Sequence, residues 1–213
     1  MSVLGHLTPF TANYAVTFDR FSARASMNLR FDAESGEYVY GSNTKPKGVA
    51  ALFGKIREWS VFKLDKNQVI PLAFVHKSRE QQNIDFDWNN KQANSTTDGQ
   101  SEVLDLDGDE LDLMSLQMQL ILDLKTNSLK DRYKVITDNV IKTYVIELEK
   151  NEDMTLDGKI LNTIKLKQQR EGSSRHTYIW LAEELDYVLV QMHQYKGSEL
   201  RGSLNLTGYK AEK

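Results

Sequence analysis

Hydrophobic residues alternate with polar residues along most of the chain. In residues 22–31 every second position is apolar, and these positions share one face: Ala23, Ala25, Met27, Leu29 and Phe31. The same period returns in residues 199–208, where Leu200, Leu204 and Leu206 share a face. Strict alternation is typical of an antiparallel strand that buries one side, so half-buried strands are predicted near both ends of the chain.

Between these ends, further alternating segments follow one another with short polar breaks, such as Asp65-Lys66-Asn67 and Asn89-Asn90-Lys91. Strands at regular short spacing, separated by turn residues, predict an antiparallel meander of about a dozen strands. A sheet of that size is expected to curl or to split. We therefore predict a single, mainly β domain over residues 1–213, with the meander curled into a half-open barrel.

The segment "LDLMSLQMQLILDLKTN" interrupts this pattern, and its length and composition favour a helix at about residues 110–126. At about 100° per residue, apolar side chains cover well over half of its circumference. A narrow polar stripe remains: Asp112, Ser115, Gln119 and Asp123. We expect such a helix to lie at the centre of the curled sheet, in its concave face. The stripe would then either face solvent or supply hydrogen bonds to the interior.

The acidic stretch "DLDGDELD", residues 105–112, raises the question of a calcium loop. Placing Gly108 at the glycine position of an EF-hand puts Val103 first and Met114 last, where acidic ligands are required. Carboxylates also gather at helix N-termini, where free N–H groups and the helix dipole stabilise them. We therefore expect a helix entry, with Asp109 or Glu110 as the cap and Gly108 in the turn.

Charge and composition narrow the class of protein. The 27 basic and 30 acidic residues give a net charge of −3 and are mixed along the chain, which argues against nucleic-acid binding and against a polybasic membrane anchor. There is no cysteine, so disulfides and thiolate chemistry are excluded. No apolar run approaches the roughly 20 residues of a membrane-spanning helix, and stable membrane insertion is not expected.

Catalytic and metal-binding motifs are not found. The four histidines, His6, His76, His176 and His193, form no recognised metal-binding spacing. His176 and His193 lie on consecutive predicted strands and are expected to be chance neighbours rather than a metal site. Nucleophile-elbow, phosphate-loop and dinucleotide motifs are missing as well. We predict no catalytic residue, metal or cofactor; an enzymatic alternative would require a polar cluster at a cavity, such as Glu58 with Ser115 and Gln119.

Several features suggest a ligand site inside the curled sheet. Glu58 and Ser60 share a face with Phe62, so either the strand turns its other face inward or two polar groups point into the interior, where a buried glutamate needs a partner. Strand aromatics either pack in the core or line a cavity, and the apolar loop "VAALFG" is either a lid or a part of the core edge. The candidate ligand-binding residues are Phe53, Glu58, Trp59, Trp88, Ser115, Gln119, Tyr178 and Trp180.

The order of several motifs resembles a known family. The opening "LTPFTANYAVTF", the segment "PKGVAALFGKIREWSVFKL", the strand "VIPLAFVHKSR" with the hairpin "IDFDWNNKQA", the helix "LDLMSLQMQLILDL" and the closing "YIWLAEELDYVLVQMHQ" are similar to the bacterial exported proteins of domain-of-unknown-function family three-one-zero-eight. The likeness covers nearly the whole chain. It implies an antiparallel β-rich fold curled around one helix, and export to the periplasm after signal cleavage, although residues 1–10 have no signal-peptide pattern.

This resemblance carries no catalytic residues, because the family has no established activity. By looser architectural analogy, curled sheets of periplasmic lipoprotein carriers hold acyl chains. We therefore expect a non-enzymatic periplasmic protein that binds a lipid, an acyl chain or a lipoprotein segment in an apolar cavity. The alternative is a structural or protein-interaction module of the envelope with a filled core.

Overall fold

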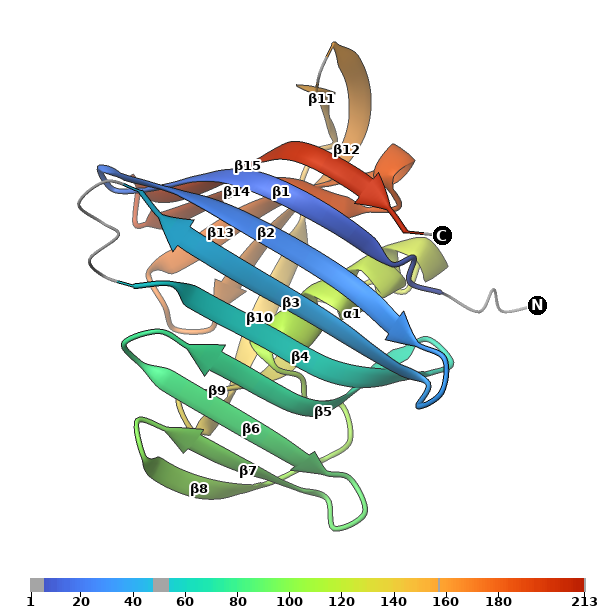
Figure 1. The fold of residues 1–213 in the computed structure, drawn as a ribbon, viewed down its shortest axis with the longest axis vertical. Coiled ribbons are helices and arrows are strands. Elements are labelled where there is room, and N and C mark those ends of the chain that lie inside the picture. The colour runs from blue at the N-terminus through green and yellow to red at the C-terminus, as the bar shows by residue number, and fades with distance from the viewer. Residues whose placement is uncertain (1–5, 48–53, 157, 213) are drawn as a thin grey trace.

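The computed structural model describes residues 6–47, 54–156 and 158–212. Within these residues, a 15-stranded antiparallel sheet curls around one α-helix, α1 (Leu113–Thr126), as Figure 1 shows. The strands are β1 (Phe10–Phe18), β2 (Phe21–Asp32), β3 (Glu37–Pro46), β4 (Ile56–Asp65), β5 (Gln68–Lys77), β6 (Gln81–Asp87), β7 (Gln92–Thr97), β8 (Gln100–Asp105), β9 (Arg132–Thr137), β10 (Val140–Leu148), β11 (Glu152–Leu156), β12 (Lys159–Arg170), β13 (Arg175–Ala182), β14 (Val188–Lys196) and β15 (Glu199–Ala211). A 3-10 turn, η2 (Glu183–Leu185), joins β13 to β14.

The two ends of the chain meet in the middle of the sheet. Strands β8 to β1 follow one another in reverse order, β1 pairs with β15, and the sheet continues through β14, β13, β12 and β10 to β9. Strand β11 pairs only with β12, and this hairpin projects beyond the rest of the sheet (Figure 1). The predicted fold, a curled antiparallel meander around one helix, is therefore confirmed.

Side chains of the β9–β10 turn help to hold the curl. Asn139 Oδ1 accepts hydrogen bonds from Ser95 Oγ at 2.8 Å and from Thr97 Oγ1 at 3.0 Å. Asn139 Nδ2 donates to the carbonyl oxygen of Gln100 at 2.8 Å. These bonds join the β9 end of the sheet to strands β7 and β8 at its other end. The sheet is drawn into a half-open barrel with helix α1 inside.

The predicted alternation of β2 is confirmed over its central part. Ala25, Met27 and Leu29 are buried against the helix side, and Met27 lies opposite Ala12 of β1 in the antiparallel register. Phe31 departs from the prediction, since 47% of its surface is exposed. It lies at the end of the strand, next to the β2–β3 turn and beyond the part of the sheet that the core covers.

The start of the helix corrects the sequence prediction. Helix α1 begins at Leu113 and its cap is Asp112, not Asp109 or Glu110. The Asp112 carboxylate accepts from the backbone N–H groups of Met114 and Ser115 at 2.8 and 2.9 Å, and Ser115 Oγ accepts from the Asp112 N–H at 2.8 Å. This reciprocal pair is a capping box. The chain stays extended up to Asp112 because Leu111 forms a parallel bridge with Val135 of β9.

The remaining acidic residues stabilise the approach to the helix. The buried Glu110 carboxylate accepts from the N–H groups of Asp107 and Gly108, at 3.1 and 2.9 Å. Gly108 has a φ of 122°, which favours glycine. Lys134 Nζ lies 2.6 Å from Asp107 Oδ2, 3.3 Å from Asp109 Oδ1 and 3.4 Å from Glu110 Oε1. The acidic cluster is therefore bound by a lysine and by backbone amides.

Two further properties of the described residues bear on function. None of them forms a group of three or more histidine, aspartate and glutamate side chains suited to a metal ion. In the same part of the chain, no helix has the length and apolarity that crossing a membrane requires.

Candidate functional site

The polar stripe of helix α1 is buried against strands β4 and β5. Ser60 Oγ of β4 donates to Asp112 Oδ2 at 2.7 Å. Gln119 Oε1 accepts from the Val69 N–H at 2.7 Å, and Gln119 Nε2 donates to the Asn67 carbonyl at 3.0 Å. The alternative that this stripe faces solvent is wrong. Its side chains fix the helix to the β4–β5 hairpin, and Ser60 does point into the interior.

The stripe ends in a second buried carboxylate. Asp123 accepts from Tyr133 Oη at 2.6 Å and from Gln119 Nε2 at 2.8 Å. Burial raises the pKa of Asp123 above its ordinary value, and the hydrogen bonds from Tyr133 and Gln119 oppose that rise. Burial also raises the pKa of Asp112, against the bonds from Ser115 and Ser60. This face of the helix is closed and fully hydrogen bonded.

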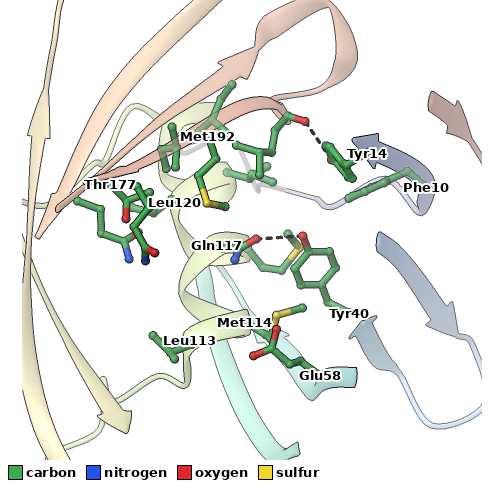
Figure 2. A pocket seen from close by; sticks show the side chains of 17 residues that line it. Phe10, Tyr14, Tyr40, Glu58, Leu113, Met114, Gln117, Leu120, Thr177 and Met192 are labelled. Atoms are coloured by element: carbon green, nitrogen blue, oxygen red, sulfur yellow. Dashed lines mark hydrogen bonds between the residues drawn. The ribbon is translucent and has the colours of Figure 1, made fainter. Parts of the chain in front are cut away.

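The opposite face of the helix leaves a cavity of about 210 Å³. It lies between α1, strands β1 and β3, and strands β13 and β14, as Figure 2 shows. Its most deeply buried lining is apolar: Phe10, Met118, Leu120, Leu181 and Leu189 are each less than a tenth exposed. The interior is therefore not packed solid, and an apolar group entering here would meet an apolar surface.

Polar side chains gather at the half-buried rim of the same cavity. Gln168 of β12 lies opposite Thr177 of β13, and Thr177 lies opposite Gln194 of β14, so the three form a row across neighbouring strands. On the helix side, Gln117 Oε1 accepts from Tyr40 Oη at 3.0 Å. The cavity is thus amphipathic, with an apolar floor and a rim of neutral amides and hydroxyls.

Two tyrosines line the cavity with their hydroxyl groups already bonded. Tyr14 Oη donates to the Leu189 carbonyl at 2.9 Å, and Tyr40 Oη bonds Gln117 (Figure 2). Burial raises the pKa of Tyr14 well above its ordinary value. The pKa of Tyr40 rises because of burial and because of the nearby Glu58 carboxylate. Both phenols therefore stay neutral.

Glu58 is a charged residue at the rim, and it is held by a histidine. Glu58 Oε1 lies 2.8 Å from His76 Nδ1, and His76 Nε2 lies 2.9 Å from Ser78 Oγ. The hydrogen bond that His76 donates to Glu58 raises the pKa of His76, against the opposing effect of burial. Glu58 therefore has the partner that an inward-facing carboxylate requires.

A serine, a histidine and a carboxylate in this order resemble the triad of hydrolases, but the serine is engaged elsewhere. Ser78 Oγ also bonds the Glu80 carbonyl at 2.9 Å and accepts from the Glu80 N–H at 3.2 Å. The Ser78 N–H is bonded to the Glu80 carbonyl at 3.0 Å, and Ser78 does not line the cavity. The N–H groups of Ser78 and Glu80 are thus both engaged within the turn and are not available to an oxyanion at Ser78. The arrangement orients Glu58.

Comparison with known proteins places the chain in a family. The model of DUF3108, proteins of unknown function, matches residues 6–201. The chain belongs to this family. The resemblance stated from the sequence motifs is thereby confirmed. No curated protein matches the chain.

One of three similar solved structures supports the fold. The β-barrel-like protein of DUF1849 from Brucella abortus is 11% identical, with a TM-score of 0.64 and 97% of this chain and 99% of that chain covered. MucB is 7% identical with a TM-score of 0.38, covering 100% of this chain and 56% of that one. A protein of YmcC-like fold from Bacteroides fragilis is 10% identical with a TM-score of 0.40, and the match covers 97% of this chain and 98% of that chain. The first of these shares the curled β architecture of this DUF3108 chain.

Of the predicted ligand-binding residues, Glu58 lines the cavity. Ser115 and Gln119 lie on the closed face of the helix. Ser115 bonds the cap residue Asp112, and Gln119 bonds the β4–β5 hairpin. Trp59 points to the outer face of the sheet, with Lys77 Nζ 5.3 Å from the centre of its ring. Phe53 lies outside the described residues.

The other predicted aromatics are also placed away from the cavity. Trp88 stacks on Phe86, with ring centres 5.6 Å apart. Tyr178 and Trp180 alternate along β13 with the cavity residues and face outward, where Lys165 Nζ lies 4.9 and 4.8 Å from their rings. Trp180 Nε1 donates to Glu152 at 2.9 Å. The rings of Tyr178 and Trp180 pack on the outer side of the sheet, whereas Trp88 packs against the core.

The rim residues Gln117, Gln168, Thr177 and Gln194 were not predicted. One signal for Thr177 was available, because it shares a strand face with Ile179 and Leu181. The row with Gln168 and Gln194 depends on strand register, which alternation within one strand does not contain.

Proposed function

We propose that this DUF3108 protein is a non-enzymatic binding protein of the periplasm, and that its cavity holds an apolar group such as an acyl chain of a lipid or lipoprotein. The observation that carries the proposal is the cavity of about 210 Å³ between helix α1 and the β13–β14 wall. Apolar cavities of roughly 150 Å³ bind benzene-sized groups in other proteins. The space is therefore large enough for a ring or for a length of alkyl chain.

The distribution of polarity supports an amphipathic ligand. Buried leucine, methionine and phenylalanine side chains form the floor, and half-buried amides and a carboxylate form the rim. Ligand sites commonly combine an apolar surface with a few polar groups that fix orientation. An acyl chain would lie on the floor with its polar end at the rim. The periplasmic location rests on the motif resemblance described above.

A fluorescence titration with the apolar probe N-phenyl-1-naphthylamine tests the proposal. Met192 lines the cavity and is half-buried, so Met192→Trp should fill the space and weaken probe binding at least ten-fold. Leu200 is 48% exposed and lines no part of the cavity, so Leu200→Trp is the matched control and should bind like the wild type. Thermal unfolding of both variants verifies that they are folded.

Two results would contradict the proposal. One is a wild-type protein that binds neither this probe nor alkyl chains and carries no co-purified lipid by native mass spectrometry. The other is a folded Met192→Trp variant that binds as tightly as the wild type. Recovery of a stoichiometric envelope protein by crosslinking, together with the first result, would favour the alternative of an interaction module.

A further inference from the structure

We propose that the occupant of the cavity carries a neutral or cationic hydrogen-bond-donating head group, and that Glu58 selects for it. This inference rests on the proposed function, because it assumes that an apolar chain enters the cavity. Its basis is the charge of the lining. Among the 17 lining residues, all within the described part of the chain, Glu58 alone carries a formal charge, and none is lysine or arginine.

The Glu58 carboxylate has an oxygen available to a ligand. Its Oε1 atom is bonded to His76, while no hydrogen bond joins Oε2 to any described residue. The side chain is 28% exposed, at the rim rather than in solvent. In Figure 2 the carboxylate lies beside Met114, below the Gln117–Tyr40 bond. An acceptor is therefore presented to the polar end of a chain that lies on the apolar floor.

Nearby cations do not offset this charge from within the cavity. Arg57 of β4 and Lys77 of β5 are next to Glu58 and His76 along their strands, so their side chains point to the outer face of the sheet. There they lie opposite each other in the strand register. His76 is the basic group that faces Glu58. Its own surroundings are acidic, since Glu80 and Asp98 act on it together with Glu58. Three carboxylates therefore act on this one imidazole.

The other polar groups of the lining bring no positive charge. The hydroxyls of Tyr14 and Tyr40 donate hydrogen bonds to the Leu189 carbonyl and to Gln117 Oε1. The remaining rim groups are neutral amides and a threonine hydroxyl. A carboxylate or phosphate head would face a like charge in a partly desolvated site. An ammonium or hydroxyl head would gain a hydrogen bond to Oε2, which is stronger when the donor is charged.

Competition by three alkyl compounds with the same chain tests the inference. Octylamine, octanol and octanoate would each displace N-phenyl-1-naphthylamine from the wild-type protein at pH 8. We expect octylamine to bind at least ten-fold more tightly than octanoate, with octanol between them, because one charge-assisted hydrogen bond is worth about a factor of ten. Octanoate binding as tightly as octylamine would overturn the inference.

Variants of Glu58 separate the head-group effect from general binding. Glu58→Gln should weaken octylamine about ten-fold and bring octanoate close to octanol, whereas Glu58→Asp should keep the wild-type order. Glu102 of β8 is exposed and lines no part of the cavity, so Glu102→Gln is the matched control and should change nothing. A folded Glu58→Gln variant with the wild-type order would overturn the inference. If no octyl compound displaces the probe and the probe itself does not bind, the proposed function fails instead.

Discussion

The two faces of helix α1 meet the same sheet in different ways. On one face, Asp112, Ser115, Gln119 and Asp123 are buried and bonded to strands β4 and β5, to Tyr133 and to the cap. On the other face, Leu113, Met114, Met118 and Leu120 lie beside an open space of about 210 Å³. One short helix is therefore attached on one side and leaves a gap on the other.

The difference shows how a cavity can persist in a curled sheet. Apolar contacts are non-directional, so a helix held only by them would shift until the space closed. Hydrogen bonds have a fixed geometry, and unmade buried ones are costly. The buried bonds from Gln119 to the β4–β5 hairpin set the position of the helix, and the opposite wall of β13 and β14 remains at a distance.

The largest effect is expected from loss of the cap. Asp112→Ala removes the acceptor for the Met114 and Ser115 N–H groups and leaves the buried Ser60 hydroxyl without its partner. We expect a loss of about 3 kcal/mol in the free energy of unfolding. Urea denaturation measures it. Asp112→Asn retains a capping oxygen and should lose only about 1 kcal/mol; equal losses in the two variants would show that the cap does not hold the helix.

The two glutamines of the helix give the next contrast. Gln119→Ala leaves the N–H of the buried Val69 without an acceptor, and we expect a loss of about 2 kcal/mol. Gln117→Ala removes only the bond from Tyr40 at the cavity rim and should lose less than about 1 kcal/mol. Denaturant midpoints of the two variants give the difference. A larger loss from Gln117→Ala would reverse the assignment of the two faces.

Two leucines one turn apart test packing on each face. Leu116 and Leu120 are both fully buried, but only Leu120 lines the cavity. Leu116→Phe should overpack the closed side and lose about 2 kcal/mol, whereas Leu120→Phe should change stability by less than about 1 kcal/mol. Thermal unfolding of the pair measures both. Similar losses would mean that no usable space lies beside Leu120.

The smallest effect concerns the ion pair at the rim. The hydrogen bond to Glu58 raises the pKa of His76, so this pair stabilises the fold fully below about pH 6.5, the ordinary pKa of histidine. The contribution is lost as the pH rises through the raised pKa of the folded state. Because both side chains are about a quarter exposed, it should be below about 1 kcal/mol. The stability difference between the wild type and His76→Gln, measured from pH 5 to 9, should shrink with rising pH; a difference that grows with pH would contradict the assigned pair.

The helix and the alternating strands were predictable from local pattern, whereas the cavity was not. Alternation alone identified the buried face of β2 through Ala25, Met27 and Leu29. In β13, however, Tyr178, Ile179, Trp180 and Leu181 are consecutive and mostly apolar. Hydrophobicity does not then distinguish the inner face from the outer face. The two outward-facing rings were accordingly predicted to be ligand-binding.

Contacts between segments distant in the sequence account for the remaining differences between the sequence predictions and the structure. The acidic stretch offers several capping carboxylates, and the bridge between Leu111 and Val135 of β9 selects Asp112. The rim row of Gln168, Thr177 and Gln194 comes from strand register. The partner of Glu58 is His76 on the neighbouring strand. Each depends on which segments the fold brings together, a property that periodicity along one segment does not contain.

The central claim is that an apolar space lies beside the helix face opposite to its hydrogen-bonded stripe. A crystal structure of the protein under xenon pressure tests it most directly, because xenon enters apolar cavities of this size. We expect a xenon peak among Leu120, Leu181 and Leu189, and its loss in the Met192→Trp variant. A structure in which side chains fill this space and no xenon binds would contradict the account.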